Sequence, residues 1–226
     1  MYKILRPSHL TLMTFLLACF LFNASAGFAG QRSWSGVDEL LRRVEKEFEH
    51  VDSIELYFYQ SIFRKGRGGA VEGEGKAWFR RPDMMRWEYE RPEKEVIVVN
   101  SDDVFVWEPE ANQVMIYKKM RFLPGTIGDI FFPKVKALKK GFEIELVKDS
   151  GDQVVIRCRP RQELGNIKKI DVTFLKKGYM YNRIVFEDTL GTRTEIRFRK
   201  VRINPDLDNA MFEFRIPDGA RVYYQD

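Results

Sequence analysis

Few side chains in this sequence could carry out acid–base or nucleophilic chemistry. The 226 residues include two histidines, His9 and His50, and two cysteines, Cys19 and Cys158. His9 and Cys19 lie in an N-terminal segment that we expect to be removed, and one histidine with one cysteine cannot form a His/Cys zinc cage. His50 is expected at the end of a helix, near the last carbonyls, rather than in a Ser-His-Asp relay. The sequence therefore predicts neither a metal site nor a cofactor.

Carboxylates are the remaining route to catalysis. Glu88 and Glu90 share one face of a predicted strand, and a pair of carboxylates can hydrolyse glycosides. They fall opposite Trp87 and Tyr89, so we expect them to be solvated. The glycine-rich residues 66–69 lack the Lys-Ser/Thr of a phosphate-binding loop and predict a hairpin loop. We therefore expect a protein that is not an enzyme, with a hydrolase built on Glu88 or an aspartate as an alternative.

The first 29 residues have the composition of a signal peptide. Lys3 and Arg6 form a basic start, residues 10–22 are apolar and uncharged, and small residues follow, with Ala26 or Ala29 as the expected last residue. We therefore expect an exported, periplasmic protein. Removal of this segment lowers the formal net charge from +5 to +3.

The remainder, residues 30–226, has the length of a single domain. Its basic and acidic residues alternate, which indicates a solvated outer face and no nucleic-acid partner. Leu16–Cys19 loosely matches the sequence around a lipidated cysteine, and this alternative to ordinary cleavage stays open. Cys158 is the only cysteine left after cleavage, so it cannot form an intramolecular disulfide and is expected to be buried and inert.

The spacing of apolar residues predicts one helix followed by a β domain. Ser35 is the expected N-cap of a helix over about residues 36–50, in which apolar residues recur every three or four positions. From Ser53 onward the period is two, and we expect about eleven strands separated by turns. Apolar and charged residues alternate most clearly in residues 142–146, 154–158, 170–174, 184–186 and 196–198.

Two central strands differ from this pattern. Residues 96–99 and 104–107 are apolar on both faces, so they must be covered on both sides or must face a cavity. Residues 121–132 are apolar without a clear period and predict a loop or short helix against these strands. A lid over an ordinary core and a lid over a cavity both fit this pattern.

One segment carries a family resemblance. Residues Phe79 to Pro92 resemble the F-x-(K/R)-R-P-x-x-(F/M)-x-W-x-Y-x-x-P block of the periplasmic outer-membrane lipoprotein carrier family, LolA. The hairpin at residues 96–109, the turn and strand at 164–174, and the ending at 212–222 are similar to later parts of the family pattern. Asp103 stands where the family has glycine.

The resemblance implies an unclosed, strongly curved antiparallel β-barrel of about eleven strands, with two or three helices as a lid over an apolar cavity. It implies a monomer that takes acylated lipoproteins from an inner-membrane ABC-type exporter to an outer-membrane acceptor. Relatives of the same fold are anchored acceptors or lipid-binding sensors, and this alternative stays open.

The resemblance also assigns roles to single residues. Arg81 is implied to hold the lid closed through hydrogen bonds to lid backbone, with a surface ion pair as the alternative, and Met85 is implied to line the cavity. For Trp87 and Phe105, core packing is an alternative to ligand contact. The residues expected to line the cavity are Met85, Trp87, Tyr89, Phe105, Trp107, Met115, Ile130, Phe131 and Phe132.

Overall fold

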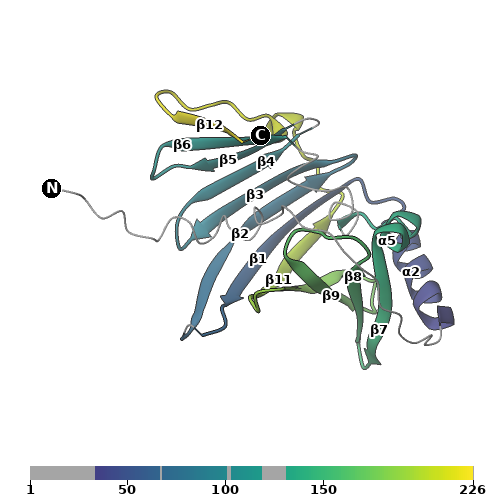
Figure 1. Ribbon diagram of the computed structural model, residues 1–226. Helices are drawn as coiled ribbons and strands as arrows, with labels where there is room; N and C mark the ends of the chain where they lie inside the picture. The colour runs from purple at the N-terminus through teal and green to yellow at the C-terminus, as the bar shows by residue number, and fades with distance from the viewer. Residues whose placement is uncertain (1–33, 67, 101–102, 119–130, 226) are drawn as a thin grey trace.

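One continuous sheet makes up most of the described protein. A computed structural model describes residues 34–66, 68–100, 103–118 and 131–225. The sheet has twelve strands in the order β12-β6-β5-β4-β3-β2-β1-β11-β10-β9-β8-β7 (Figure 1). The strands are β1 (Ser53–Phe63), β2 (Ala70–Arg80), β3 (Met84–Arg91), β4 (Glu95–Val99), β5 (Asp103–Glu108), β6 (Gln113–Lys118), β7 (Phe142–Ser150), β8 (Gln153–Pro160), β9 (Ile167–Leu175), β10 (Tyr181–Asp188), β11 (Arg193–Ile203) and β12 (Arg221–Gln225).

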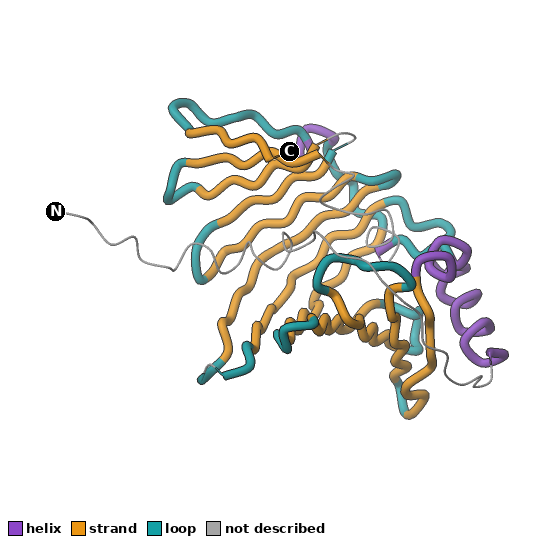
Figure 2. The backbone as a smooth tube through the Cα atoms, viewed as in Figure 1, coloured by secondary structure: helices purple, strands orange, loops and turns teal. Residues whose placement is uncertain are grey.

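Two antiparallel meanders, β1 to β6 and β7 to β11, form this sheet through the pairing of β1 with β11. At the far edge β12 pairs in parallel with β6. The strands near β7 run at a steep angle to those near β12, so the sheet is strongly curved, and its two end strands do not pair with each other (Figure 2). The predicted mainly β, unclosed fold is confirmed, with twelve strands instead of about eleven.

Helix α2 (Trp34–Phe48) covers the β7 end of the sheet together with the short helix α5 (Val135–Gly141) (Figure 1). Its apolar residues, among them Leu41, Val44 and Phe48, are buried as the spacing predicted. The helix begins at Trp34, so the prediction of Ser35 as its N-cap is wrong. A third, 3-10 helix, η1, spans Asn209–Phe212.

The face of the sheet that packs against α2, which we call the inner face, carries the alternating apolar residues. Ile144 pairs with Cys158 and Cys158 with Ile170, so cross-strand neighbours share this face. Cys158 is buried, and burial raises the pKa of its thiol to about 12. A raised pKa disfavours the reactive thiolate. The prediction that Cys158 is buried is confirmed, and its inertness stays a prediction.

The opposite, outer face of β7 to β11 carries ion pairs within strands and between neighbouring strands. Arg157 donates to Asp171 at 2.7 Å from Nε and at 2.9 Å from Nη2. Glu195 accepts hydrogen bonds from Arg183, Arg193 and Arg197. These groups explain the alternation of charges in the sequence, and each solvent-accessible pair contributes under about 1 kcal/mol.

The two-sided apolar strands β4 and β5 are covered on their outer face by the C-terminal segment. Phe214 stacks on Phe105 with ring centroids 5.1 Å apart and lies 6.3 Å from Trp107. Phe212 in η1 is fully buried, and Arg86 on β3 donates to the Met211 carbonyl at 3.1 Å. Both faces of β4 are therefore buried, and the outer face of β5 is half-buried.

The glycine-rich loop joins β1 and β2 as a hairpin, as predicted, with Phe63 opposite Ala70. Further along β2, Gly75 lies opposite Phe58 on β1 and Tyr89 on β3, beside an irregularity in the register with β3. A Cβ atom added at Gly75 would collide with the Glu88 carbonyl oxygen and would lie 2.9 Å from the Phe58 ring.

Gly75→Ala is therefore expected to lower the free energy of unfolding by about 2 kcal/mol, because an inner-face strand would have to shift. Urea denaturation followed by tryptophan fluorescence measures this change. Gly68→Ala is the matched control, since a Cβ atom there meets nothing within 4 Å. Equal stability of the two variants would contradict the close approach of β2 and β3.

Candidate functional site

Aromatic side chains from two strands, β1 and β3, meet on the inner face of the β1–β6 half of the sheet. Phe58 lies 4.2 Å from Trp87 and 5.0 Å from Tyr89 between ring centroids. The intervening strand β2 carries Gly75 and Ala77 at the same level, and both are small. Because these residues leave room above β2, rings from β1 and β3 contact each other across it.

Met85 and Met115 extend this aromatic group along and across the strands. Trp87 pairs with Ile97, Ile97 with Val106, and Val106 with Met115, which places Met115 on the inner face of β6. Met85 lies two residues before Trp87 and packs against the apolar core. The structure therefore brings together Met85, Trp87, Tyr89 and Met115, and their contact with a ligand stays a prediction.

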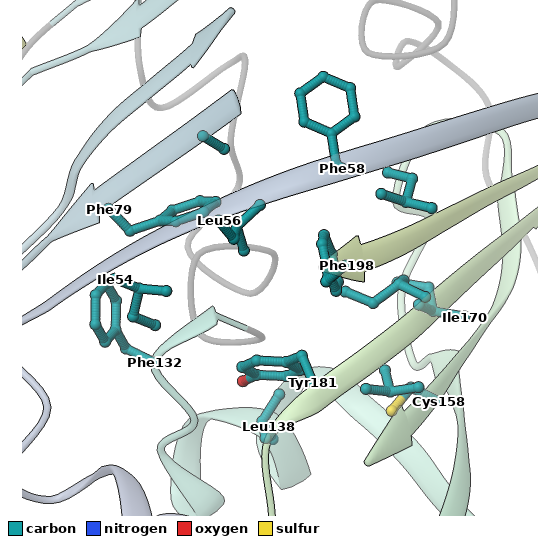
Figure 3. Close-up of a cluster of buried hydrophobic side chains, with 14 of the residues drawn as sticks. Ile54, Leu56, Phe58, Phe79, Phe132, Leu138, Cys158, Ile170, Tyr181 and Phe198 are labelled. Carbon is teal, nitrogen blue, oxygen red and sulfur yellow. The ribbon is translucent and has the colours of Figure 1, made fainter. Parts of the chain in front are cut away.

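Phe131 and Phe132 lie between the two halves of the sheet. The Phe131 ring stacks on Phe79 at 4.4 Å and lies 6.4 Å from the ring of Phe198 on β11. Figure 3 shows Phe132 beside Ile54 and below Phe79. Both predicted residues thus pack on the apolar inner surface, while Ile130 lies outside the described residues.

Phe105 and Trp107 lie on the other side of the sheet. Their pairing with Val98 and Val96 puts them on the outer face of β5, where Phe214 covers them. The prediction that they line the same wall as Trp87 is wrong. Alternation showed that the two rings share a face, but both faces of this strand are apolar, so the pattern did not show which face is the inner one.

Arg81, in the turn between β2 and β3, fastens the end of α2. Its Nη2 donates to the Phe48 carbonyl at 2.9 Å, and its Nε donates to the Val51 carbonyl at 2.7 Å. The guanidinium also lies 4.8 Å from the centre of the Phe132 ring. One side chain thus contacts the last turn of α2, the connection to β1, and the segment before α5.

The chemistry of Arg81 suits this position. The last carbonyls of a helix have no partners within the helix, and a cation is favourable at that end. The planar guanidinium offers five donors and stays charged. Its described partners are backbone carbonyls, as the family resemblance implied, rather than the carboxylate of a surface ion pair. The role of Arg81 in opening and closing a lid stays a prediction.

Asn204 is a second fastening residue, which sequence reasoning missed. Its Oδ1 accepts from the Asp52 amide at 2.7 Å, and its Nδ2 donates to the His50 carbonyl at 2.8 Å. The signal for it was the Asn204-Pro205 dipeptide, which marks a turn. Together with Arg81, it holds the connection between α2 and β1 from the opposite side.

The candidate catalytic residues are placed on the surface. Glu88 accepts from Arg86 at 2.6 Å and Glu90 pairs with Lys76 at 3.4 Å on the outer face, as predicted. His50 is exposed just beyond the end of α2. Among the described residues, no group of three or more His, Cys, Asp or Glu side chains could hold a metal ion.

A small polar group on the inner face was also missed. The Tyr89 hydroxyl donates to Gln60 Oε1 at 3.0 Å, and Glu95 lies opposite Tyr89 on β4. Only 7% of Glu95 is exposed. Burial, with Glu108 and Glu93 nearby, raises the pKa of the Glu95 carboxyl to about 7.

Comparison with known proteins identifies the family of this chain. A family model described as outer membrane lipoprotein carrier protein LolA matches residues 49–215, a range that includes Arg81, Met85 and Trp87. The chain belongs to the LolA family. The family description names a carrier and not an enzyme, and it confirms the resemblance that the Phe79–Pro92 segment carries.

Named LolA relatives cover most of the chain at modest identity. The outer-membrane lipoprotein carrier protein of Chromohalobacter salexigens is 28% identical over 180 residues, which are 80% of this chain and 84% of that protein. The protein of the same name from Pseudomonas putida KT2440 is 25% identical over 207 residues, 92% of this chain and 95% of that protein.

A solved structure shares the fold of this chain. An uncharacterized conserved protein from Thermus thermophilus superimposes with a TM-score of 0.56 at 16% identity, covering 84% of this chain and all of that one. In the described part of the chain, no helix is long and apolar enough to cross a membrane.

The buried Glu95 carboxyl predicts a pH dependence of stability. Its pKa is higher in the folded protein than the ordinary 4.5, so the folded state binds more protons between pH 4.5 and about 7. The free energy of unfolding is therefore expected to fall as pH rises through this window, by up to about 3 kcal/mol.

Glu95→Gln should remove this pH-dependent loss, which urea denaturation at several pH values measures. Glu90→Gln, at an exposed carboxylate on the outer face, should leave the dependence unchanged. If the wild type and Glu95→Gln lost stability equally across the window, the burial of Glu95 would be refuted.

Proposed function

We propose that this protein is a periplasmic carrier that binds the acyl chains of lipoproteins released from the inner membrane and delivers them to an outer-membrane acceptor. Membership of the LolA family supports this function. The single structural observation that carries it is the pair of hydrogen bonds from Arg81 to Phe48 and Val51, which ties α2 to the sheet beside the apolar inner face.

The inner face has the composition that acyl chains require. Each methylene removed from water contributes about 0.8 kcal/mol, so binding several chains needs an extended apolar surface. Trp87, Met85 and Met115 provide such a surface, and methionine adapts to chains of irregular shape. In this proposal the cargo takes the place of the aromatic contacts of Phe131 with Phe79.

Release requires a second conformation of the protein, one that binds the cargo weakly. We propose that the structure with Arg81 bonded to the end of α2 is the closed, empty state, and that cargo binds when α2 and the segment around Phe132 move away. A ligand that binds only the open state shifts the population toward it. The bonds of Arg81 then favour closure, and closure expels the cargo toward an acceptor.

The remaining features of the proposal follow from this role. The chain is exported with residues 1–29 as its signal peptide, residues 30–226 form one non-enzymatic domain, and an inner-membrane ABC-type exporter loads it. An anchored acceptor would instead use Cys19 as a lipidation site, and labelling of cells with radioactive palmitate distinguishes the two. We expect no label on the protein.

Arg81→Leu is expected to leave the protein folded and loaded with lipoprotein but slow in transfer to an acceptor. Leucine cannot donate to the carbonyls of Phe48 and Val51, so the closed state loses two charge-assisted hydrogen bonds. Because the open state binds the cargo, we expect the variant to bind its cargo at least about tenfold more tightly. Transfer of a labelled lipoprotein from the purified carrier to the acceptor measures the effect.

Arg80→Leu is the matched control for this experiment. Arg80 precedes Arg81 but donates to the Leu207 carbonyl on the other side of the sheet, at 2.7 Å. Its loss should leave transfer unchanged. Normal transfer by Arg81→Leu would rule out the proposed role of Arg81 in closure.

Met85→Glu is expected to reduce the uptake of an apolar fluorescent lipid by at least about tenfold, because it places a carboxylate on the surface that binds the chain. Met84→Glu, one residue earlier and on the other face of β3, should bind the lipid normally. Fluorescence titration measures both affinities, and similar losses in the two variants would remove Met85 from the binding surface.

A further inference from the structure

A buried carboxylate interrupts the apolar inner face at the end away from α2. Tyr89 on β3 is four residues beyond Met85, about 13 Å along the strand, and Glu95 pairs with Tyr89 on the neighbouring strand β4. Glu108 follows on β5, directly after the pair formed by Val96 and Trp107. The apolar surface therefore runs from Arg81 and Met85 to a polar end formed by Glu95, Glu108 and Tyr89.

Glu95 is the unusual member of this polar end. Only 7% of the residue is exposed, and no hydrogen bond or ion pair joins its carboxylate to another described residue, so the solvent contact that its oxygens keep is their only compensation. Glu108, in contrast, accepts a hydrogen bond from Gln113 Nε2 at 2.6 Å. A buried carboxylate without a partner is unfavourable in the empty protein, so an external partner would relieve the cost.

A second buried polar group lies on the same surface. The indole Nε1 of Trp87 lies near the Tyr89 hydroxyl, but no acceptor in the described protein meets it with hydrogen-bond geometry. Trp87 is only 6% exposed. The inner face thus carries an unpartnered donor on β3 and an unpartnered acceptor on β4. A polar ligand head with a hydrogen-bond acceptor and a donor could bind both groups.

We infer that Glu95, with Glu108 beside it, forms a subsite for the polar head of an acylated cargo, and that this subsite prefers a head bearing an ammonium group or amide N–H donors. The inference rests on the proposed function, since it assigns the head of the same cargo whose chains lie along Trp87 and Met85. It adds a direction: the chains point toward Arg81 and α2, and the head lies beside β4 and β5, which Figure 1 shows away from α2 in the sheet.

Charge determines which heads fit. Two carboxylates lie at this end, and Glu93 adds a third negative charge that acts on Glu95. Above about pH 7, where Glu95 is ionised, an anionic head such as a carboxylate or phosphate would be repelled, whereas an ammonium group would form charge-assisted hydrogen bonds. Such a subsite would select among amphiphiles with the same chain, which an apolar surface alone does not do.

The test uses the full mature chain and pyrene-labelled alkyl probes of one chain length with an ammonium, a neutral amide or a carboxylate head. Wild-type protein is expected to bind the ammonium probe about tenfold more tightly than the carboxylate probe. In Glu95→Gln this ratio should fall to within about twofold, with the affinity for the amide probe retained. An acylated peptide with the same ammonium group distinguishes a protein cargo from a free amino-lipid, and preferential binding of either supports the subsite.

Glu90→Gln on the outer face is the matched control and should keep the wild-type ratio. Should Glu95→Gln fail to fold, Glu108→Gln, which removes the neighbouring carboxylate, is measured in its place. Binding of all three probes with equal affinity by the wild type would overturn the subsite and leave the carrier function intact. Failure of the wild type to bind any of the probes would overturn the carrier function, and the subsite with it.

Discussion

The backbone pairing of β1 with β11 joins strands from opposite ends of the chain, and the rest of the structure depends on it. Phe58 opposite Phe198 and Gln60 opposite Ile196 fix a register in which both meanders turn their apolar residues to one side. A slip by one residue would turn those residues outward in one of the halves. With this register, α2 and Phe131 can contact residues from both halves, and one apolar core results.

Much of this fold could be predicted from the sequence because most strands bury only one face. Alternation identified the strands that carry Ile144, Ile156, Ile170 and Ile184, and the charges on their other side form the observed ion pairs. The prediction was wrong for Phe105 because β5 is apolar on both faces. The contact of Phe105 with Phe214, more than a hundred residues later in the chain, shows that Phe105 lies on the outer face. The local sequence pattern carries no information about so distant a contact.

The candidate site was predictable to the extent that a family motif marks it. Arg81 could be singled out only by resemblance, because an arginine in a turn is otherwise an ordinary surface residue. Asn204 and Glu95 escaped notice since their importance comes from tertiary contacts: Asn204 satisfies backbone groups of a distant segment, and Glu95 is buried by neighbours on other strands. The Asn204-Pro205 dipeptide signals only a turn, and nothing in the sequence around Glu95 signals its burial.

The cover that the C-terminal segment gives to β4 and β5 has a consequence for biogenesis. Phe212 and Phe214 are synthesised about a hundred residues after β4 and β5, yet they cover the outer face of these strands. Until they arrive, Val98 and Phe105 present an uncovered apolar surface. The nascent chain therefore cannot complete its fold from the N-terminus onward, and this half of the sheet keeps an exposed apolar face until the C-terminal segment docks on it.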